Sequence, residues 1–404
     1  MTEYMSEVKE KDRIRRSSMA PPGYRPAVST ESFVFIGLSA GLLWLVCGRM
    51  GLSNMINTIM NTAYSLLKET VFYIMAIAVL AGAISGLMTE FGVVALLNRL
   101  LSGLMMPLYH LPGASVLGIL STYLSDNPAI LTLAEDRGFR CFFKKYQLPA
   151  LTNLGTSFGM GMIITTFMFG LQTEGKGGFL VATLLGNLGA VAGSIVSVRL
   201  MLRYAKRMYG TEALCEDDSA AEVDLQKYRP IRSGTAAGRF MEAMLEGGKS
   251  GVQMGMAIIP GVLIICTLVL VLTNGPGEGG NYTGAAYEGI GLLPEIGRIL
   301  TPVLKPLFGF TSPEAIAVPI TALGAAGASI GLIPPMVNAG LAGARDIAVF
   351  TAMCMCWSGY LSTHVAMMDS LGCSNLTGKA IFSHTIGGIA AGITANILCT
   401  ICGL

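Results

Sequence analysis

Long apolar runs, separated by short polar or glycine-rich segments, dominate this sequence. A helix rises about 1.5 Å per residue, so roughly twenty apolar residues cross the hydrocarbon core of a bilayer. Seven runs approach or exceed that length: residues 33–51, 70–88, 148–170, 178–201, 252–273, 346–366 and 378–402. The pattern predicts an all-α polytopic membrane protein with about seven transmembrane helices.

Two further stretches, residues 113–136 and 313–340, are apolar at both ends and broken in the middle. Asp126 and Pro128 interrupt the first, and a run of glycines, alanines and a serine at 324–329 interrupts the second. A continuous helix would place Asp126 at membrane depth, where an acid is costly. We therefore predict two re-entrant helical hairpins, with Asp126 and Pro128 in the turn of the first.

Basic residues orient the spans. They cluster at residues 9–16, 137–145 and 203–232, whereas residues 274–297 contain no lysine or arginine. The positive-inside rule places the three basic groups in the cytoplasm and the glycine-rich segment outside. In the cytoplasmic membrane of a bacterium, the N-terminus is then cytoplasmic and the C-terminus outside. This arrangement requires the first broken stretch to enter and leave from one face, as a re-entrant hairpin does.

The two halves of the chain repeat each other. "NRLLSGLMMPLY" at 98–109 aligns with "GRILTPVLKPLF" at 297–308 at a constant offset of 199. Each copy reads as an interfacial helix before a broken stretch, and the two start from opposite sides of the membrane. Such inverted repeats are typical of secondary transporters. The predicted organisation is a disordered cytoplasmic tail at 1–31, a first transmembrane helix at 32–54, a first repeat at 55–201, a cytoplasmic linker at 202–236 and a second, inverted repeat at 237–404.

The composition agrees with a polytopic membrane protein and argues against other classes of protein. Hydrophobic residues make up 52% of the 404 residues, charged residues 13%, and the mean hydropathy is +0.60. The net charge of +2 gives no indication of nucleic-acid binding. The nine cysteines lie mostly in apolar runs without zinc-type spacing, so we expect free thiols, no metal site and no bound cofactor. No motif places a nucleophile beside a base, so no catalytic residue is predicted and an enzyme is not expected.

The turn of the first broken stretch carries the strongest candidate chemistry. Ser125, Asp126 and Asn127 precede a helix that restarts at Pro128. Asp126 can accept hydrogen bonds from a polar ligand, carry a proton or offset a cation. The alternative is that Asp126 only caps the second arm of the hairpin. Both roles are compatible. Within residues 317–340 of the second hairpin, Asn338 is the only strongly polar side chain, and the small residues of the tip fit either a binding tip or close helix packing.

Two spans are expected to unwind near their middles. The first, "LTNLGTSFGMGMIITT", contains Asn153 and Ser157 as candidate substrate ligands. Its Gly155 and Thr156, together with Asp126, are the candidates for coupling to an ion, because exposed carbonyl groups can coordinate sodium. The counterpart, "CMCWSGYLSTHVAMM", supplies four more candidates: Trp357, Ser358, Ser362 and His364. Helix packing for the tryptophan, and a satisfied interior position for the histidine, are the structural alternatives.

The order of these elements resembles the Gate-domain (nucleoside recognition) membrane proteins, which include spore maturation proteins and the membrane part of ferrous-iron transporters. It also resembles the core of concentrative nucleoside transporters, over roughly residues 55–404. "LSDNP" stands where those transporters have Gln-Thr-Glu-x-Pro, so Ser125 matches the Thr and Asp126 the Glu. Trp357, Gly359 and Ser362 fall near the family's aromatic, Asn and Ser positions. The family's Asn-Glu-Phe-Val motif has no counterpart here. The resemblance implies the fold and a homotrimer, and leaves the substrate open.

The expected function is secondary active transport of a small polar solute, nucleoside-like solutes included. Coupling to sodium or protons and alternating access around the two hairpin tips complete this expectation. One alternative is passage of a divalent metal, as in ferrous-iron transporters, although no GxxxxGK[ST] motif for nucleotide hydrolysis occurs. Another is a non-transporting envelope or sporulation protein. In each case the lipid bilayer is a partner and nucleic acid is not.

The topology is testable by cysteine accessibility. A cysteine introduced within residues 202–236 should react with a membrane-impermeant thiol reagent only from the cytoplasmic side, because this loop carries six basic residues. A cysteine introduced within residues 275–285 should react only from outside. Labelling of both positions from one side would contradict the inverted repeat.

Overall fold

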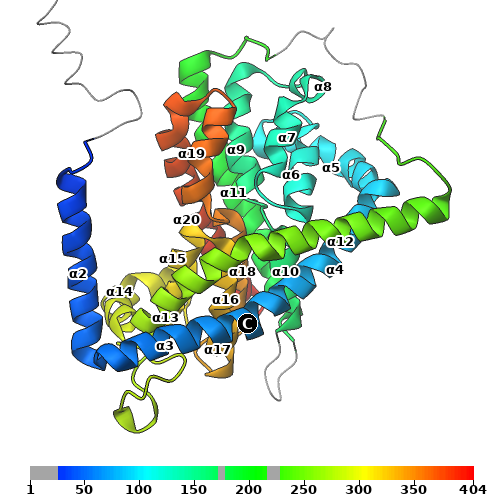
Figure 1. The fold of residues 1–404 in the computed structure, drawn as a ribbon. Coiled ribbons are helices and arrows are strands. Elements are labelled where there is room, and N and C mark those ends of the chain that lie inside the picture. The colour runs from blue at the N-terminus through cyan, green and yellow to red at the C-terminus, as the bar shows by residue number, and fades with distance from the viewer. Residues whose placement is uncertain (1–25, 172–177, 216–227) are drawn as a thin grey trace, which may run out of the picture. The chain divides into compact units, whose positions relative to one another are not determined.

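A computed structural model of the protein describes residues 26–171, 178–215 and 228–404. In these residues the regular elements are helices, with one isolated bridge between Lys144 and Leu214 (Figure 1). The chain divides into two compact units, Met1–Ile56 and Asn57–Leu404. The all-helical architecture expected from the apolar runs is confirmed.

The first unit contains helix α2 (Thr30–Met50), which matches the predicted first span. Its start is ordered by Ser32, whose hydroxyl accepts a hydrogen bond from the backbone N–H of Ser29 at 3.3 Å. Its end is set by Gly51, which has a φ of 78° that favours glycine. Most apolar side chains of α2 are exposed, as suits contact with lipid. Most of the predicted tail at 1–31 lies outside the described residues.

The second unit begins within helix α3 (Leu52–Ser65) and contains two halves with the same order of elements. After α3 the first half continues with a π-helical segment η1 (Leu66–Val71), α4 (Phe72–Glu90), α5 (Val93–Tyr109), α6 (Ser115–Leu124), α7 (Ala129–Glu135), α8 (Arg137–Arg140), η2 (Lys145–Gln147), α9 (Leu148–Thr156), α10 (Gly161–Gly170) and α11 (Leu180–Tyr209). The second half consists of α12 (Ala236–Gly261), a π-helical segment η4 (Val262–Cys266), α13 (Thr267–Thr273), η5 (Glu278–Gly280), α14 (Leu292–Phe308), η6 (Pro313–Ile316), α15 (Ala317–Gly324), α16 (Ala326–Gly331), α17 (Ile333–Asn338), α18 (Ala344–Trp357), α19 (Tyr360–Ser370), η7 (Ser374–Leu376) and α20 (Thr377–Ile401).

The correspondence between the halves extends well beyond the twelve-residue match seen in the sequence. Helices α5 and α14 are each 17 residues long and start 199 residues apart. A π-helical segment interrupts the long helix that begins each half. The helix pairs α9–α10 and α18–α19 are each broken near the middle, at residues 157–160 and at Ser358 and Gly359. The repeat is therefore structural, although most of its residues differ.

Long helices of the two halves pack against each other in antiparallel pairs. Along α4, Ala78, Gly82 and Gly86 meet partners on α12 whose numbers fall as theirs rise. At the centre of this crossing, a Cβ added at Gly82 would collide with the carbonyl oxygen of Gly247, and one at Gly247 with that of Gly82. Gly82 and Gly247 are 165 residues apart, not the 199 of the repeat, so this is a close approach of two antiparallel helices and not a contact between equivalent positions. Small residues allow two helix backbones to approach this closely in a membrane.

The pair α11 and α20 repeats this arrangement. Gly189 lies against Ala391, and Gly193 lies against Gly387, so these helices also run in opposite directions. Helix α11 continues to Tyr209, past the predicted start of the linker at 202. The basic residues Lys206 and Arg207 lie in its last turn, where positive charge stabilises the carboxyl end of a helix.

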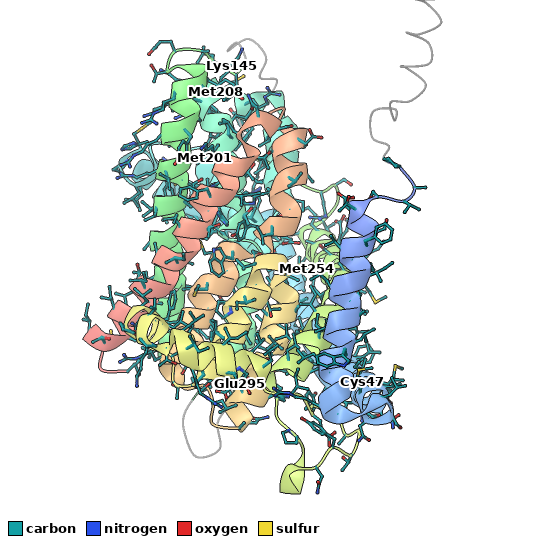
Figure 2. All side chains as sticks on the ribbon, turned by 90° about the vertical axis from the view of Figure 1, so that its left-hand side faces the viewer. Cys47, Lys145, Met201, Met208, Met254 and Glu295 are labelled. Atoms are coloured by element: carbon teal, nitrogen blue, oxygen red, sulfur yellow. The ribbon has the colours of Figure 1, made fainter. Side chains whose placement is uncertain are left out.

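Five helices in the described residues are long and apolar enough to cross a bilayer, or six if the bent pair formed by α14 and Pro313–Gly324 counts as one span. The sequence predicted about seven crossings. The difference arises because two predicted spans, 148–170 and 346–366, each consist of two short helices. Lys145, from a predicted cytoplasmic segment, and Glu295, next to a predicted outer one, lie at opposite ends of the second unit (Figure 2).

The glycine-rich segment before α14 is organised around one carboxylate. Glu288 accepts hydrogen bonds from the backbone N–H and hydroxyl of Thr283, at 3.0 and 2.7 Å, and from the N–H of Gly284 at 3.0 Å. Thr58 on α3 also donates to it, at 3.4 Å. Burial acts to raise the pKa of Glu288, but these hydrogen bonds outweigh it and hold the pKa below its usual value. The predicted outer segment is thereby tied to α3.

Replacing Gly82 by alanine tests the α4–α12 contact. The added methyl group has no room, so we expect a lower melting temperature in detergent and a loss of about 1–3 kcal/mol of unfolding free energy, typical of overpacking. Gly103→Ala on α5 is the matched control, because nothing lies within 4 Å of its added Cβ. The control should be neutral or stabilising by up to about 1 kcal/mol. Equal effects of the two substitutions would contradict the packing described here.

Candidate functional site

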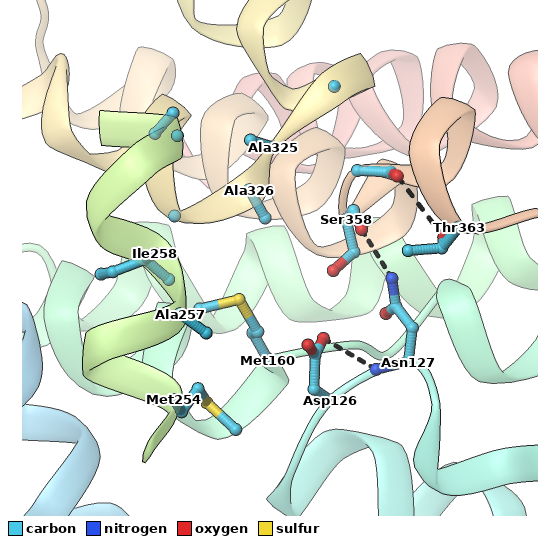
Figure 3. Close-up of a pocket in the computed structure, with 15 residues that line it drawn as sticks. Asp126, Asn127, Met160, Met254, Ala257, Ile258, Ala325, Ala326, Ser358 and Thr363 are labelled. Atoms are coloured by element: carbon cyan, nitrogen blue, oxygen red, sulfur yellow. Dashed lines mark hydrogen bonds between the residues drawn. The ribbon is translucent and has the colours of Figure 1, made fainter. Parts of the chain in front are cut away.

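Four breaks in helices meet around one cavity of about 220 Å³ (Figure 3). Two are the tips of the broken stretches, at residues 125–128 between α6 and α7 and at Ala325 between α15 and α16. The other two interrupt α9–α10 and α18–α19. Helix α12 closes the remaining side. The lining residues are Asp126, Asn127, Met160, Met254, Ala257, Ile258, Gly261, Gly324, Ala325, Ala326, Gly327, Ala328, Ser358, Gly359 and Thr363.

The first tip places a carboxylate at the cavity. The two arms α6 and α7 pack against each other through Ile130, whose side chain fills the space beside Gly118. Between the arms, Asp126 accepts a hydrogen bond from the backbone N–H of Asn127 at 2.7 Å. This local bond leaves the second carboxylate oxygen of Asp126 with no protein donor among the described residues. Figure 3 shows the carboxylate directed toward the cavity.

Asn127 connects the first tip to the break between α18 and α19. Its amide nitrogen donates to the carbonyl oxygen of Ser358 at 2.6 Å, so a residue of the first half supports an interrupted helix of the second. Its amide oxygen is buried and has no donor in the described part of the chain. A side chain at Gly159 would occupy the position of that oxygen, which accounts for glycine at 159.

The second tip contributes backbone and small side chains only. Helix α15 ends at Gly324, and Ala325 is extended, with φ −158° and ψ 111°. The N–H of Gly359 donates to the carbonyl oxygen of Ala322 at 2.8 Å and ties this tip to the same interrupted helix. The hydroxyl of Ser329 is used inside the tip, donating to Ala326 O at 2.7 Å. Neither tip contains a basic side chain facing the cavity.

Unusual backbone conformations interrupt the helices at the two breaks α9–α10 and α18–α19. Met160 (φ 55°), Ser358 (φ 34°) and Gly359 (φ 69°) all adopt the left-handed region, which is costly for residues other than glycine. The hydroxyl of Ser358 donates to the carbonyl oxygen of Gly159 at 3.1 Å, linking the two breaks directly. Strain of this kind persists where surrounding contacts enforce it, and it is common at functional sites.

Several residues predicted as ligands lie away from the cavity. Asn153 donates to Ser197 Oγ at 2.9 Å, to Ser383 Oγ at 3.1 Å and to Ala380 O at 3.2 Å, so its amide nitrogen joins α9 to α11 and α20. The Ser157 hydroxyl donates to the carbonyl of Asn153 at 2.8 Å. These side chains act in helix packing in this structure.

The candidates for ion coupling are divided in the same way. The Thr156 hydroxyl donates to Thr152 O at 2.9 Å, within its own helix. Gly155 packs against Ile130 of the first hairpin. Neither lines the cavity, whereas Asp126 does. Ser125 ends α6 beside the cavity, with its N–H directed to Thr122 O at 3.3 Å.

The remaining candidates of the second half also differ in position. Trp357 packs its ring nitrogen against Gly388 of α20 rather than into the cavity. Asn338 is exposed at the end of α17. The side chain of Ser362 lies outside what the structure describes. Of the predicted substrate ligands, the cavity therefore brings together Asp126, Asn127 and Ser358.

His364 and His384 form a buried pair that sequence reasoning found only in part. Their ring centroids are 4.7 Å apart, and both side chains are fully buried. Nε2 of His384 donates to Cys356 O at 2.7 Å, and Nδ1 accepts from the Ser197 hydroxyl at 2.9 Å. Neither ring nitrogen of His364 has a hydrogen-bond partner among the described residues. His384 was missed because it sits in an uninterrupted apolar span without a break to mark it.

Comparison with known proteins adds a fold-level likeness. No protein-family model matches the chain, and no curated protein matches it in sequence. The structure of CNTnw in an inward-facing substrate-bound state matches at 14% identity over 93% of this chain and 87% of that chain, with a TM-score of 0.53. A CNTnw variant in its first intermediate state matches at 14% identity over 91% and 85%, with a TM-score of 0.55. A double variant in an outward-facing state matches at 13% identity over 92% and 85%, with a TM-score of 0.53. The chain thus has the fold of CNTnw, which is a concentrative nucleoside transporter.

The two histidines should respond oppositely to substitution by phenylalanine. His384→Phe removes a donor to Cys356 O and an acceptor for Ser197, so we expect a loss of about 2–4 kcal/mol of unfolding free energy. His364→Phe replaces unpartnered buried nitrogens by carbon and should be neutral or stabilising. Thermal unfolding in detergent measures both. A larger loss for His364→Phe than for His384→Phe would contradict the contacts described here.

Proposed function

We propose that the protein is a secondary active transporter that moves a small polar solute across the bacterial cytoplasmic membrane. Nucleoside-like solutes are included, and the driving force is a sodium or proton gradient. The observation that carries the proposal is the single cavity on which both hairpin tips and both interrupted spans converge. In inverted-repeat transporters, discontinuous helices of this kind form the substrate site near the membrane midplane.

The size of the cavity supports a small solute. Its volume of about 220 Å³ lies below the roughly 300–1,000 Å³ common for drug-sized ligands. Asp126, Asn127 and Ser358 supply the polar contacts in the proposed site, and the other candidate ligands support the helices that position them. The orientation with a cytoplasmic N-terminus and an outer C-terminus, and assembly as a homotrimer, belong to the same proposal.

Alternating access around the tips is supported by the contacts that join them. Asn127 binds Ser358 O, and Gly359 N–H binds Ala322 O, so the α18–α19 break is held by both tips at once. A shift of either tip breaks the hydrogen bond that this tip makes to the α18–α19 break. The solved structures with this fold include inward-facing, intermediate and outward-facing states of CNTnw. We extend the same cycle to this chain.

Ion coupling in this proposal centres on Asp126. The carbonyl oxygens of Gly155 and Thr156 accept from Phe158 N–H at 3.1 Å and Gly159 N–H at 3.2 Å. Sodium coordination by them competes with these bonds. Asp126 has a carboxylate oxygen facing the cavity and can hold either a proton or a cation. No specific observation favours metal passage, since the described residues contain no group of three or more His, Cys, Asp or Glu that could hold a metal ion.

Asp126→Asn tests the proposal. Asn retains the oxygen that accepts the Asn127 N–H bond, so the melting temperature should stay within a few degrees of the wild-type value. Uptake of radiolabelled small solutes, nucleosides among them, into proteoliposomes under an imposed gradient should be abolished or change its ion dependence. A proton-coupled mechanism predicts loss of the dependence on external pH, and a sodium-coupled one predicts weaker sodium activation.

Asp136→Asn is the matched control for that experiment. Asp136 is exposed and accepts a hydrogen bond from Phe139 N–H at 2.7 Å, which Asn can also accept. It should transport as the wild type does. Normal uptake by the Asp126→Asn protein would make Asp126 a structural residue only. Uptake no greater than in empty liposomes for the wild type, under both gradients, would contradict the transport function.

A further inference from the structure

We infer that the solute bound in the cavity carries one positively charged amine, which the Asp126 carboxylate and the Asn127 amide oxygen hold. This inference rests on the transport function proposed above and names a chemical class for its substrate. It follows from the hydrogen bonds that the polar side chains of the lining make, from the charge of these side chains, and from the apolar walls of the cavity.

The polar side chains of the lining present mainly acceptors. The hydroxyl hydrogen of Ser358 is used by Gly159 O at 3.1 Å, and that of Thr363 by Gly359 O at 3.4 Å. One N–H of the Asn127 amide is used by Ser358 O at 2.6 Å. The oxygens of these groups remain able to accept. A ligand rich in donors is therefore complementary, and an ammonium group offers three donors and no acceptor.

Among the described lining residues, the amide oxygen of Asn127 is the one buried side-chain polar atom without a hydrogen-bond partner. Asn127 is only 1% exposed, yet its oxygen has no donor in the described part of the protein. A buried acceptor without a donor is destabilising, so such groups call for an explanation. Figure 3 shows this oxygen on the side of Asn127 that faces Asp126. One ammonium group between them would satisfy both.

The charge of the lining points to a cation. Among the described residues that line it, Asp126 is the only ionisable side chain, and none is a lysine, arginine or histidine. Among the residues that the structure describes, Asp126 takes part in no ion pair. A carboxylate at membrane depth requires a partner, and a cationic ligand supplies it. No basic side chain of the described lining would meet a negative group on the solute, so the side chains favour a cation.

The rest of the wall suits a short apolar body. Met254, Ala257 and Ile258 of α12 line the cavity across from Asp126, and Met160 lines it beside the acid (Figure 3). Thioether side chains adapt to different apolar shapes. The inferred substrate class is thus a small organic monoamine, with the amine at the first hairpin tip and the apolar part against α12.

Ligand-induced stabilisation of the purified full-length protein tests this. The probe is 4-aminobutan-1-ol, and the matched neutral compound is butane-1,4-diol, which has a hydroxyl in place of the ammonium. Melting temperatures are recorded in detergent at constant ionic strength with potassium chloride, with sodium chloride as a separate arm. The amine should raise the melting temperature saturably and the diol should not. Asp126→Asn should weaken the apparent affinity about tenfold or more, as expected for a lost charge-assisted hydrogen bond, and Asp136→Asn should not.

Three outcomes overturn the inference: equal stabilisation by amine and diol, stabilisation by sodium alone, or unchanged amine binding by the Asp126→Asn protein. Stabilisation by sodium alone would assign the acid to an inorganic cation.

Failure of the transport proposal is a separate result. If the amine binds as expected but neither it nor any nucleoside enters proteoliposomes under either gradient, the amine site stands and transport does not. If a neutral solute is taken up while the amine does not bind, transport stands and the amine inference does not.

Discussion

Backbone hydrogen bonding in a medium without water is the constraint on which this fold depends. A helix that stops inside the hydrocarbon leaves N–H and C=O groups that no solvent can satisfy, so breaks occur only where other protein groups replace the lost bonds. Here the breaks satisfy one another. Gly359 N–H binds Ala322 O across two interrupted elements, and the carbonyl oxygens of Ser358 and Gly159 receive side-chain donors from Asn127 and Ser358. Because each break depends on the others, they gather in one place and leave a cavity between them.

The same constraint explains why some polar residues line the cavity and others pack between helices. Groups at the breaks have neighbours on one side and the cavity on the other, so part of their hydrogen-bonding capacity stays available. Groups one turn away are surrounded by helices, and the fold takes up their donors. Asn153 illustrates the second case: its nitrogen is shared among α11 and α20, and its buried oxygen has no donor among the described residues. Asn127 illustrates the first, because its nitrogen supports the α18–α19 break and its side chain lines the cavity. The same amide thus lies at the cavity or between helices according to its position relative to the break.

Sequence reasoning was most successful where a residue conflicts with its surroundings. Asp126 and Pro128 within an apolar stretch predicted a break, and α6 and α7 flank one there. It was less successful where one type of side chain can either bind a ligand or pack between helices. Asn153, Ser157 and Trp357 are of types common in binding sites, but here they pack between helices. The α12 wall of the cavity could not have been found, because Met254, Ala257 and Ile258 resemble any lipid-facing residues until the fold places them opposite the tips. The crossing of α4 and α12 was also hidden, since a glycine in a helix does not reveal its partner.

That crossing has a consequence for how the two halves can vary over evolutionary time. Gly82 and Gly247 each lie against the other's carbonyl oxygen, so a methyl group at either position pushes the same two backbones apart. Once one glycine has been replaced and the helices have moved apart, replacing the other glycine costs little further stability. The two positions are therefore thermodynamically coupled, and their substitution costs are not additive. Although 165 residues separate them in the chain, their substitutions act on the same contact, which links two halves whose residues mostly differ.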